Sequence, residues 1–324
     1  MRNVNIIFAS VLLCAVLFTG CPAGPKNSPH ILSLRPPGKS NIEVKAAIEI
    51  TDIPGRLAVF EDAGFSKYVG VFGVHVFATT STPDSKLLHA AKVMAQYLDN
   101  NADGAPDNPL VLGHLLSRNA YLVMTADEDE FETLDHDTWH DAGFGCGQFL
   151  HARETRPDFL NQGRINAPHG HYDASLEEVL HLVTDHGYGN AYPSVFGRER
   201  GTAISNCLDA ARGGYFPGVP KDGPHYGYPE GSWFHYDDET CDYDCMISEY
   251  IYWALTSILG TQDYPGRFED IRREWELNTK DLVRSKDPAI YALSTNSEYK
   301  FPSKAPDGNY APFALPTTVI LPVK

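Results

Sequence analysis

The fold is decided by the stretch Leu176-Glu177-Glu178-Val179-Leu180-His181. Apolar residues recur there at positions i, i+3, i+4 and i+7, which predicts a helix with one buried stripe: Leu176, Val179, Leu180 and Val183. Glu177 and His181 are four residues apart on the opposite face, so their side chains stack, and Glu178 projects from the same polar face. This part of the chain therefore presents two carboxylates and one imidazole together.

This layout is that of the H-E-x-x-H metallopeptidase helix, with Glu177 in the place of the first histidine. In that motif, the first and last residues hold a metal ion and the middle glutamate handles protons. The pattern in this chain is E-E-x-x-H, with Glu178 at the proton-handling position.

Strands and helices are predicted in a definite order around the motif. A strand-rich stretch covers 68–80, a helix 86–98, a strand 120–125, a short helix 128–134 and a strand 147–153. Two more helices are predicted over 246–259 and 268–283, and the last forty residues, rich in Pro and Tyr, are expected to wrap the surface. Gly187 is expected to end the motif helix.

This order resembles that of the zincin metallopeptidases over residues 68–260. The resemblance implies an α+β fold in which a small mixed sheet lies over an active-site helix, with further helices at the C-terminal end. It also implies that an edge strand just before that helix, here 148–153, binds an extended peptide or protein substrate.

Glu249 is the one charge inside a helix that is apolar nearly all round, 245–255. A buried carboxylate is costly unless it is paired or bound to a metal. In the gluzincin branch of the zincins, the third ligand is a Glu on a downstream helix, so the resemblance implies the ligand set Glu177, His181 and Glu249, with Glu178 as general base. The alternative is that Glu249 pairs with an Arg or a Tyr hydroxyl in the core.

Zinc is the metal expected here, although two carboxylates and one imidazole make a harder site that also suits iron or manganese. Other histidines offer alternative ligands: His169, His171 and His186. Glu178 also has a second interpretation, because Ser175-x-x-Glu178 is a capping box. Asp173 is an equally good N-cap, and it would leave Glu178 available for chemistry.

His235 and Tyr236 precede the Glu249 helix, and either could donate to an oxyanion, a role that zincin sites give to Tyr or His. The alternative is an acidic loop held by a disulfide, with His235 on its surface.

The stretch 99–107 resembles the front of an EF-hand calcium loop. Oxygen-bearing side chains occupy loop positions 1, 3, 5 and 9, and a glycine stands at position 6: Asp99, Asn101, Asp103, Asp107 and Gly104. Leu110 replaces the bidentate glutamate at position 12. We expect a structural calcium site within 99–110, and the alternative is a solvated acidic turn.

The N-terminus is typical of an exported protein. Residues 1–20 read as a signal peptide, with an apolar run over 6–18. The ending Phe18-Thr19-Gly20-Cys21 resembles a bacterial lipobox, which implies that Cys21 is lipidated and that 21–45, rich in Pro, Gly and Ser, is a tether. Residues 46–324 then form a single domain, and the protein is expected to be a periplasmic or cell-surface lipoprotein.

The four cysteines beyond Cys21, namely Cys146, Cys207, Cys241 and Cys245, are expected to form two disulfides in an oxidising compartment. Three connectivities are possible. Cys241 and Cys245 flank a tight acidic turn, so the expected pairing gives each of them one of the other two cysteines.

The net charge of −16 and the absence of a basic patch argue against a nucleic-acid partner. The chain has no G-x-S-x-G, Walker or dinucleotide motif. The sequence thus predicts an exported, lipid-anchored, metal-dependent hydrolase, a peptidase that uses a metal-activated water. The alternative is a calcium-stabilised surface binding protein whose zincin-like core has lost catalysis.

Overall fold

The computed structural model describes residues 41–45, 48–163, 171–221, 227–312 and 316–320. Its strands are β1 (Asn41–Val44), β2 (Lys67–Val71), β3 (Val74–Ala78), β4 (Tyr121–Thr125), β5 (Gly147–His151) and β6 (Thr317–Ile320). Its helices are α2 (Ala58–Asp62), α3 (Asp84–Leu98), α4 (Pro109–Ser117), α5 (Glu128–Glu132), α6 (His136–Asp141), α7 (Ser175–Leu182), α8 (Gly189–Ala191), α9 (Pro193–Phe196), α10 (Ala203–Ala211), α11 (Tyr243–Ile258), α12 (Arg267–Ile271), α13 (Lys280–Lys286) and α14 (Pro288–Thr295). Short 3₁₀ turns (Gly55–Leu57, Ala152–Glu154) and π-helical turns (Phe159–Gly163, Val183–Tyr188) complete them.

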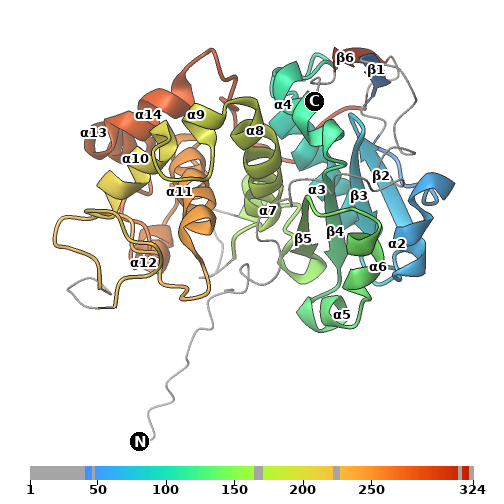
Figure 1. The fold of residues 1–324 in the computed structure, drawn as a ribbon, viewed down its shortest axis with the longest axis horizontal. Coiled ribbons are helices and arrows are strands. Elements are labelled where there is room, and N and C mark those ends of the chain that lie inside the picture. The colour runs from blue at the N-terminus through green and yellow to red at the C-terminus, as the bar shows by residue number, and fades with distance from the viewer. Residues whose placement is uncertain (1–40, 46–47, 164–170, 222–226, 313–315, 321–324) are drawn as a thin grey trace, which may run out of the picture.

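The main sheet has the strand order β2-β3-β4-β5 (Figure 1). Strands β2 and β3 are antiparallel, whereas β3 pairs with β4, and β4 with β5, in parallel. The prediction of an α+β chain with a small mixed sheet is therefore confirmed, and β5, the strand before the motif helix, lies at the edge of the sheet.

The β2–β3 hairpin turns on two residues, Phe72 and Gly73, which both have positive φ values of 49° and 86°. A two-residue turn of this kind matches the right-handed twist of the flanking strands. A glycine adopts this backbone conformation without steric cost.

Both faces of the sheet are covered by helices. One face packs against α3 and α7 through aliphatic side chains such as Val76, Leu122 and Leu150. The other face meets α2, α5 and α6 through an aromatic cluster that includes Phe60 and Trp139. Strands β3 and β4 are buried along their whole length, as expected for the central strands of a sheet covered on both faces.

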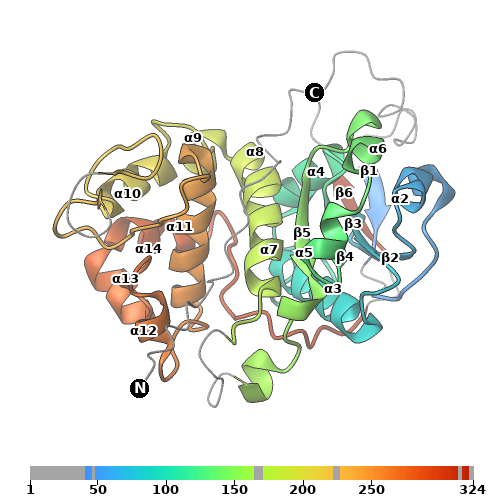
Figure 2. The same ribbon diagram turned by 90° about the horizontal axis from the view of Figure 1, so that it is seen from below.

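Helix α7 lies between the sheet and the group of helices α10 to α14 in both views (Figures 1 and 2). It packs against β5 and α3 on one side and against α11 on the other. Its apolar stripe therefore faces the core around the sheet, and its polar face is directed to α11.

The motif helix does not end at Gly187, and the prediction of a stop there is wrong. The helix continues through the π-helical turn Val183–Tyr188 into α8. A Cβ on Gly187 would lie 2.7 Å from the Val111 side chain on α4. This glycine therefore permits close packing of two helices and has no role as a terminator.

The predicted helix 268–283 is also wrong. It is divided into α12 and α13 by an irregular stretch in which Trp275 and Leu277 are buried, and Thr279 caps the start of α13. The C-terminal residues, expected to wrap the surface, include helix α14, which Asp287 caps. A local helical pattern does not show where a buried aromatic side chain interrupts it.

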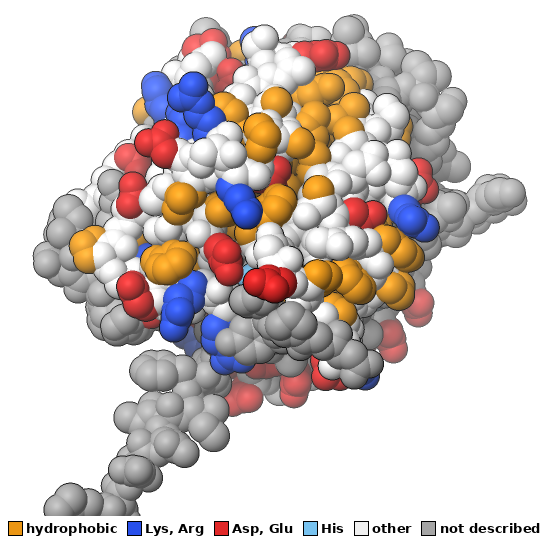
Figure 3. Space-filling model, turned by 90° about the vertical axis from the view of Figure 1, so that its left-hand side faces the viewer, with side chains coloured by type: hydrophobic (Ala, Val, Ile, Leu, Met, Phe, Trp, Pro, Cys, Tyr) orange, Lys and Arg blue, Asp and Glu red, His pale blue; other side chains and the backbone are white. Residues whose placement is uncertain are grey.

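The first and last described strands form a second, two-stranded sheet, in which β1 pairs with β6. The predicted boundary between tether and domain at residue 45 falls just after β1. The predicted signal peptide, the lipobox and Cys21 lie outside the described residues. Within the described residues, no helix has the length and apolar character needed to span a bilayer. Acidic, basic and apolar side chains are interspersed on the face in Figure 3.

We expect Gly187→Ala to lower the free energy of unfolding by about 1–3 kcal/mol, the usual cost of overpacking a core. The clash with Val111 should outweigh the roughly 1 kcal/mol that alanine gains over glycine in a helix. Urea denaturation measures the difference. The control is Gly55→Ala, where an added Cβ meets nothing within 4 Å. Equal stability of the two variants would contradict the packing role.

Candidate metal centre

Glu177, His181 and Glu249 come together at the seam between α7 and α11. Their ligand atoms all lie within 4.8 Å of one another, and the three residues form a group that could hold a metal ion. No other group of three or more His, Cys, Asp or Glu side chains in the described part of the chain gathers in this way. The sequence placed two of these residues on one helix, and the fold brings the third to them.

The distances in the triad suit one small cation. His181 Nε2 lies 3.5 Å from Glu249 Oε1 and 3.9 Å from Glu177 Oε1. Two ligands that are each about 2.0–2.2 Å from one zinc ion can be at most roughly 4.4 Å apart. Both distances from the imidazole fall within that limit.

His181 is buried without a hydrogen bond. Its side chain is 4% exposed, and neither Nδ1 nor Nε2 has a hydrogen-bond partner. A buried polar group left unpaired costs about 1–3 kcal/mol. A cation bound at Nε2 would remove this cost there, whereas Nδ1 lacks the carbonyl or carboxylate acceptor that usually orients a metal-binding histidine.

The electrostatics of the triad also favour a cation. Burial lowers the pKa of His181, but the carboxylates of Glu249 and Glu177 outweigh it and raise that pKa to about 10. Burial raises the pKa of Glu249 well above its usual value, since the attraction of His181 only partly offsets desolvation and Glu177 adds repulsion. The ion pairs of Glu249 among the described residues are limited to His181. The three side chains thus perturb one another strongly, as expected for a cluster of ionisable groups buried together.

Glu178 lies beside the triad and is 7% exposed. Its Oε2 accepts a hydrogen bond from Gln148 Nε2 on the edge strand β5, at 2.5 Å. The amide of Ser175 donates to Asp173 Oδ1, so Asp173 takes the position that Glu178 would fill in a capping box. The local geometry thus agrees with the N-cap interpretation of Asp173.

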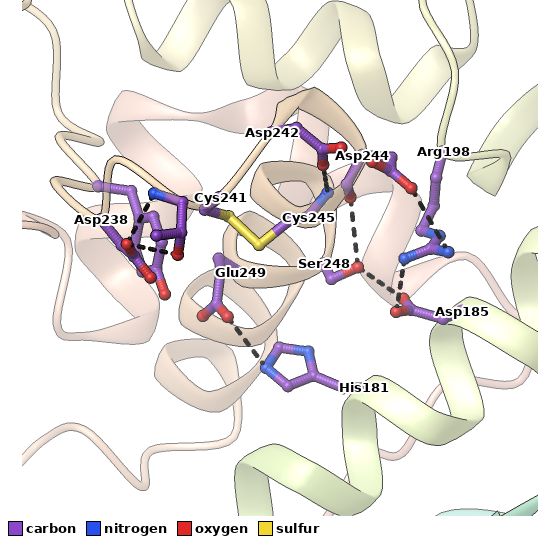
Figure 4. Close-up of a disulfide and its surroundings, with 12 residues drawn as sticks. His181, Asp185, Arg198, Asp238, Cys241, Asp242, Asp244, Cys245, Ser248 and Glu249 are labelled. Carbon is purple, nitrogen blue, oxygen red and sulfur yellow. Dashed lines mark hydrogen bonds and ion pairs between the residues drawn. A yellow bond between two sulfur atoms is a disulfide. The ribbon is translucent and has the colours of Figure 1, made fainter. Parts of the chain in front are cut away.

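A second polar contact joins the same two helical segments (Figure 4). Ser248, next to Glu249 in α11, donates to Asp185 Oδ1 at 2.7 Å, and Asp185 lies one turn after His181. Arg198 pairs with Asp185 at 2.9 Å and reaches Asp244 at 3.6 Å. This network fixes α7 against α11 one turn away from the triad, and sequence patterns alone did not reveal it.

The predicted disulfide pairing is wrong. Cys241 and Cys245 bond to each other, whereas Cys207 is a buried free thiol (Figure 4). The reason is the start of α11, where Asp242 caps the Cys245 amide and turns the chain into the helix. The two Cα atoms are then 5.4 Å apart, within the normal span of a disulfide. Cys146 pairs with neither of these cysteines nor with Cys207.

The alternative histidine ligands do not join the triad where the structure describes them. Neither His171 nor His186 belongs to the group of Glu177, His181 and Glu249 that could hold a metal ion. Burial lowers the pKa of His186 to about 4. His169 lies outside the described residues. His181 is thus the histidine that the fold brings to Glu249.

His235 is 1% exposed, and its Nε2 lies 2.9 Å from Ser232 Oγ. Tyr236 is 5% exposed, and its carbonyl accepts from Tyr228. No described contact joins either residue to the triad, and His235 is not on the surface of its loop. Their role as oxyanion donors stays a prediction.

The proposed calcium loop is closed by hydrogen bonds of its own. Asp99, fully buried, accepts from the amides of Asp103 and Gly104 and from the hydroxyl of Tyr310. Asn101 and Asp103 accept from loop amides, and Asp107 accepts from the Asn100 amide. The loop also docks the C-terminal segment through Asn100 and Lys304. Its acidic side chains do not gather into a group of three or more whose oxygen atoms could hold one metal ion.

Comparisons of the chain with protein-family models, with curated proteins and with solved structures found no match. Function is therefore inferred from the geometry and chemistry of the site.

We expect a peptide map of the unreduced protein to show Cys241 bridged to Cys245. The Cys207 thiol should react with an alkylating reagent only after unfolding, because it is buried and burial raises its pKa to about 12. The reduced protein is the control. A bridge from Cys207 to either cysteine of the loop would contradict the structure.

Proposed function

We propose that the protein is a metal-dependent hydrolase, most specifically a peptidase of zincin-like type, in which Glu177, His181 and Glu249 hold one divalent cation. The observation that carries this proposal is the buried imidazole of His181, which has no hydrogen-bond partner and lies between two carboxylates. Zinc is the metal we favour for this donor set.

The residues of the site have separate tasks in this proposal. A divalent cation held by Glu177, His181 and Glu249 would supply Lewis acidity toward a water and a substrate carbonyl. Glu178 would accept a proton from the attacking water and return it to the leaving amine. Gln148 orients the Glu178 carboxylate by its hydrogen bond from β5.

The edge position of β5 supports peptide as the substrate class. An extended peptide can pair with the free backbone groups of an edge strand, and side-chain contacts then give specificity. Strand β5 carries Gln148, which donates a hydrogen bond to Glu178. A peptide on this edge would therefore lie close to the general base. We also propose, from the N-terminal sequence, that the protein is exported and attached to a membrane through a lipidated Cys21.

The proposal separates four variants. His181→Ala and Glu249→Ala should lose the bound metal, because each removes a ligand. Glu178→Gln should keep the metal and lose turnover by about 10²-fold or more, the scale of general-base loss. Elemental analysis of purified protein and cleavage of an unfolded protein substrate measure the two effects. Glu132→Gln, on the exposed surface of α5, is the matched control.

A Glu178→Gln variant with full activity would remove the proposed base. A His181→Ala variant that keeps its metal would remove the proposed ligand set. A metal-free wild-type protein would favour the alternative, a surface binding protein without catalysis.

We further propose that calcium binds the loop 99–107. Calcium should raise the melting temperature of the wild type, since a ligand that binds only the folded state stabilises it. Asp103→Ala should lose most of that gain, whereas Asp84→Ala, an exposed acidic change at the start of α3, should retain it. Equal melting temperatures with calcium and with chelator would contradict a calcium site.

A further inference from the structure

Arg267 is a buried cation without a carboxylate partner. The residue is 7% exposed, and the ion pairs of the described residues include none from it. Its Nε donates to Gln262 Oε1 at 2.7 Å, and its Cζ lies 4.5 Å from the ring centre of Tyr172. Buried charges are normally paired with an opposite charge, and no described carboxylate forms an ion pair with this guanidinium.

Trp253 offers a donor without a partner next to it. The residue is 6% exposed, and its indole Nε1 has no hydrogen-bond partner. The Arg267 guanidinium carbon is 5.6 Å from the Trp253 ring centre. An indole N–H can only donate, so both groups call for an acceptor, and an anion would satisfy both.

These donors lie close to the triad. Trp253 is four residues after Glu249 in α11, so the two side chains share one helix face about 6 Å apart along the axis. The ring of Tyr252 links the two groups, because its centre is 5.8 Å from that of His181 and 6.3 Å from that of Tyr172. Arg267, Trp253 and the metal ligands therefore belong to one continuous region.

The carboxyl group of Glu274 is the internal competitor for Arg267. Burial raises its pKa to about 7, Asp237 and Glu177 add to the increase, and Arg267 partly offsets it. No ion pair joins Glu274 to Arg267 among those of the described residues. Among the described residues, Arg267 therefore has no carboxylate in ion-pair contact.

We propose that Arg267 and Trp253 bind a carboxylate of the substrate, and so form a specificity subsite beside the metal triad. The placement relative to a scissile bond rests on the proposed hydrolase function. A guanidinium binds a carboxylate through two parallel N–H donors, and the indole N–H adds a third. The carboxylate is either the C-terminus of a peptide or an acidic side chain.

The test uses short N-acetylated peptides and calorimetry on the full chain. One pair differs in a free or amidated C-terminus, and a second, amidated pair differs in Asp or Asn. The wild type should bind the charged member of one pair about 10- to 100-fold more tightly, the scale of a hydrogen bond to a charged group. Preference in the first pair identifies the C-terminus as the source, and preference in the second identifies an acidic side chain.

Arg267→Gln should abolish this preference, and Trp253→Phe, which keeps the ring but removes the N–H, should reduce it. Arg272→Gln changes the same charge on the exposed end of α12 and should leave it intact. Melting curves check that each variant folds. If Arg267→Gln does not fold, the peptide preference of Trp253→Phe decides the case.

Equal affinity of the wild type for the charged and neutral peptides would overturn the proposal, and so would a preference that survives both substitutions. The same measurement on His181→Ala separates the two proposals. A carboxylate preference in that variant would support the subsite even if the wild type held no metal.

Discussion

The contact between His181 on α7 and Glu249 on α11 is the interaction on which the site depends. Both side chains are buried, and their nearest atoms are 3.5 Å apart, without a hydrogen bond. The helices that carry them belong to different parts of the fold, since α7 packs on the sheet and α11 lies among the C-terminal helices. The site therefore exists only when these two parts are packed together.

That packing is supported on either side of the triad. The Ser248–Asp185–Arg198 network joins the helices one turn further along, and the disulfide closes the first turn of α11. On the other side, Gln148 connects β5 to Glu178. Ligands held by rigid elements and by neighbouring polar contacts lose little entropy on binding a cation, which is the usual requirement of a metal site.

The sequence predicted much of the fold because hydrophobic periodicity is a local property. Periodicity predicts the strands within 68–80, 120–125 and 147–153. It also predicts the helices near 86–98, 128–134 and 246–259. Glu177 and His181 could be paired by their spacing on one helix. Glu249 could be found because it is an isolated charge in an apolar helix.

What the sequence did not predict depends on contacts between distant segments. The interruption at Trp275 requires the strand-like bridge to Phe234, and the continuation past Gly187 requires the close approach of Val111. A spacing of four residues does not by itself decide whether Cys241 and Cys245 pair. The bond between them follows from the helix cap at Asp242, which the sequence pattern did not reveal. Arg267 and Trp253 showed no pattern, because a cation without a carboxylate and an indole N–H without an acceptor are recognised only when their surroundings are known.

The central claim is that one cation occupies the triad, and anomalous diffraction from crystals grown with zinc tests it most directly. The account predicts an anomalous peak about 2.0–2.2 Å from His181 Nε2 and from a carboxylate oxygen of both Glu177 and Glu249. A crystal without a peak at this position, or with Glu249 turned away from His181, would contradict it.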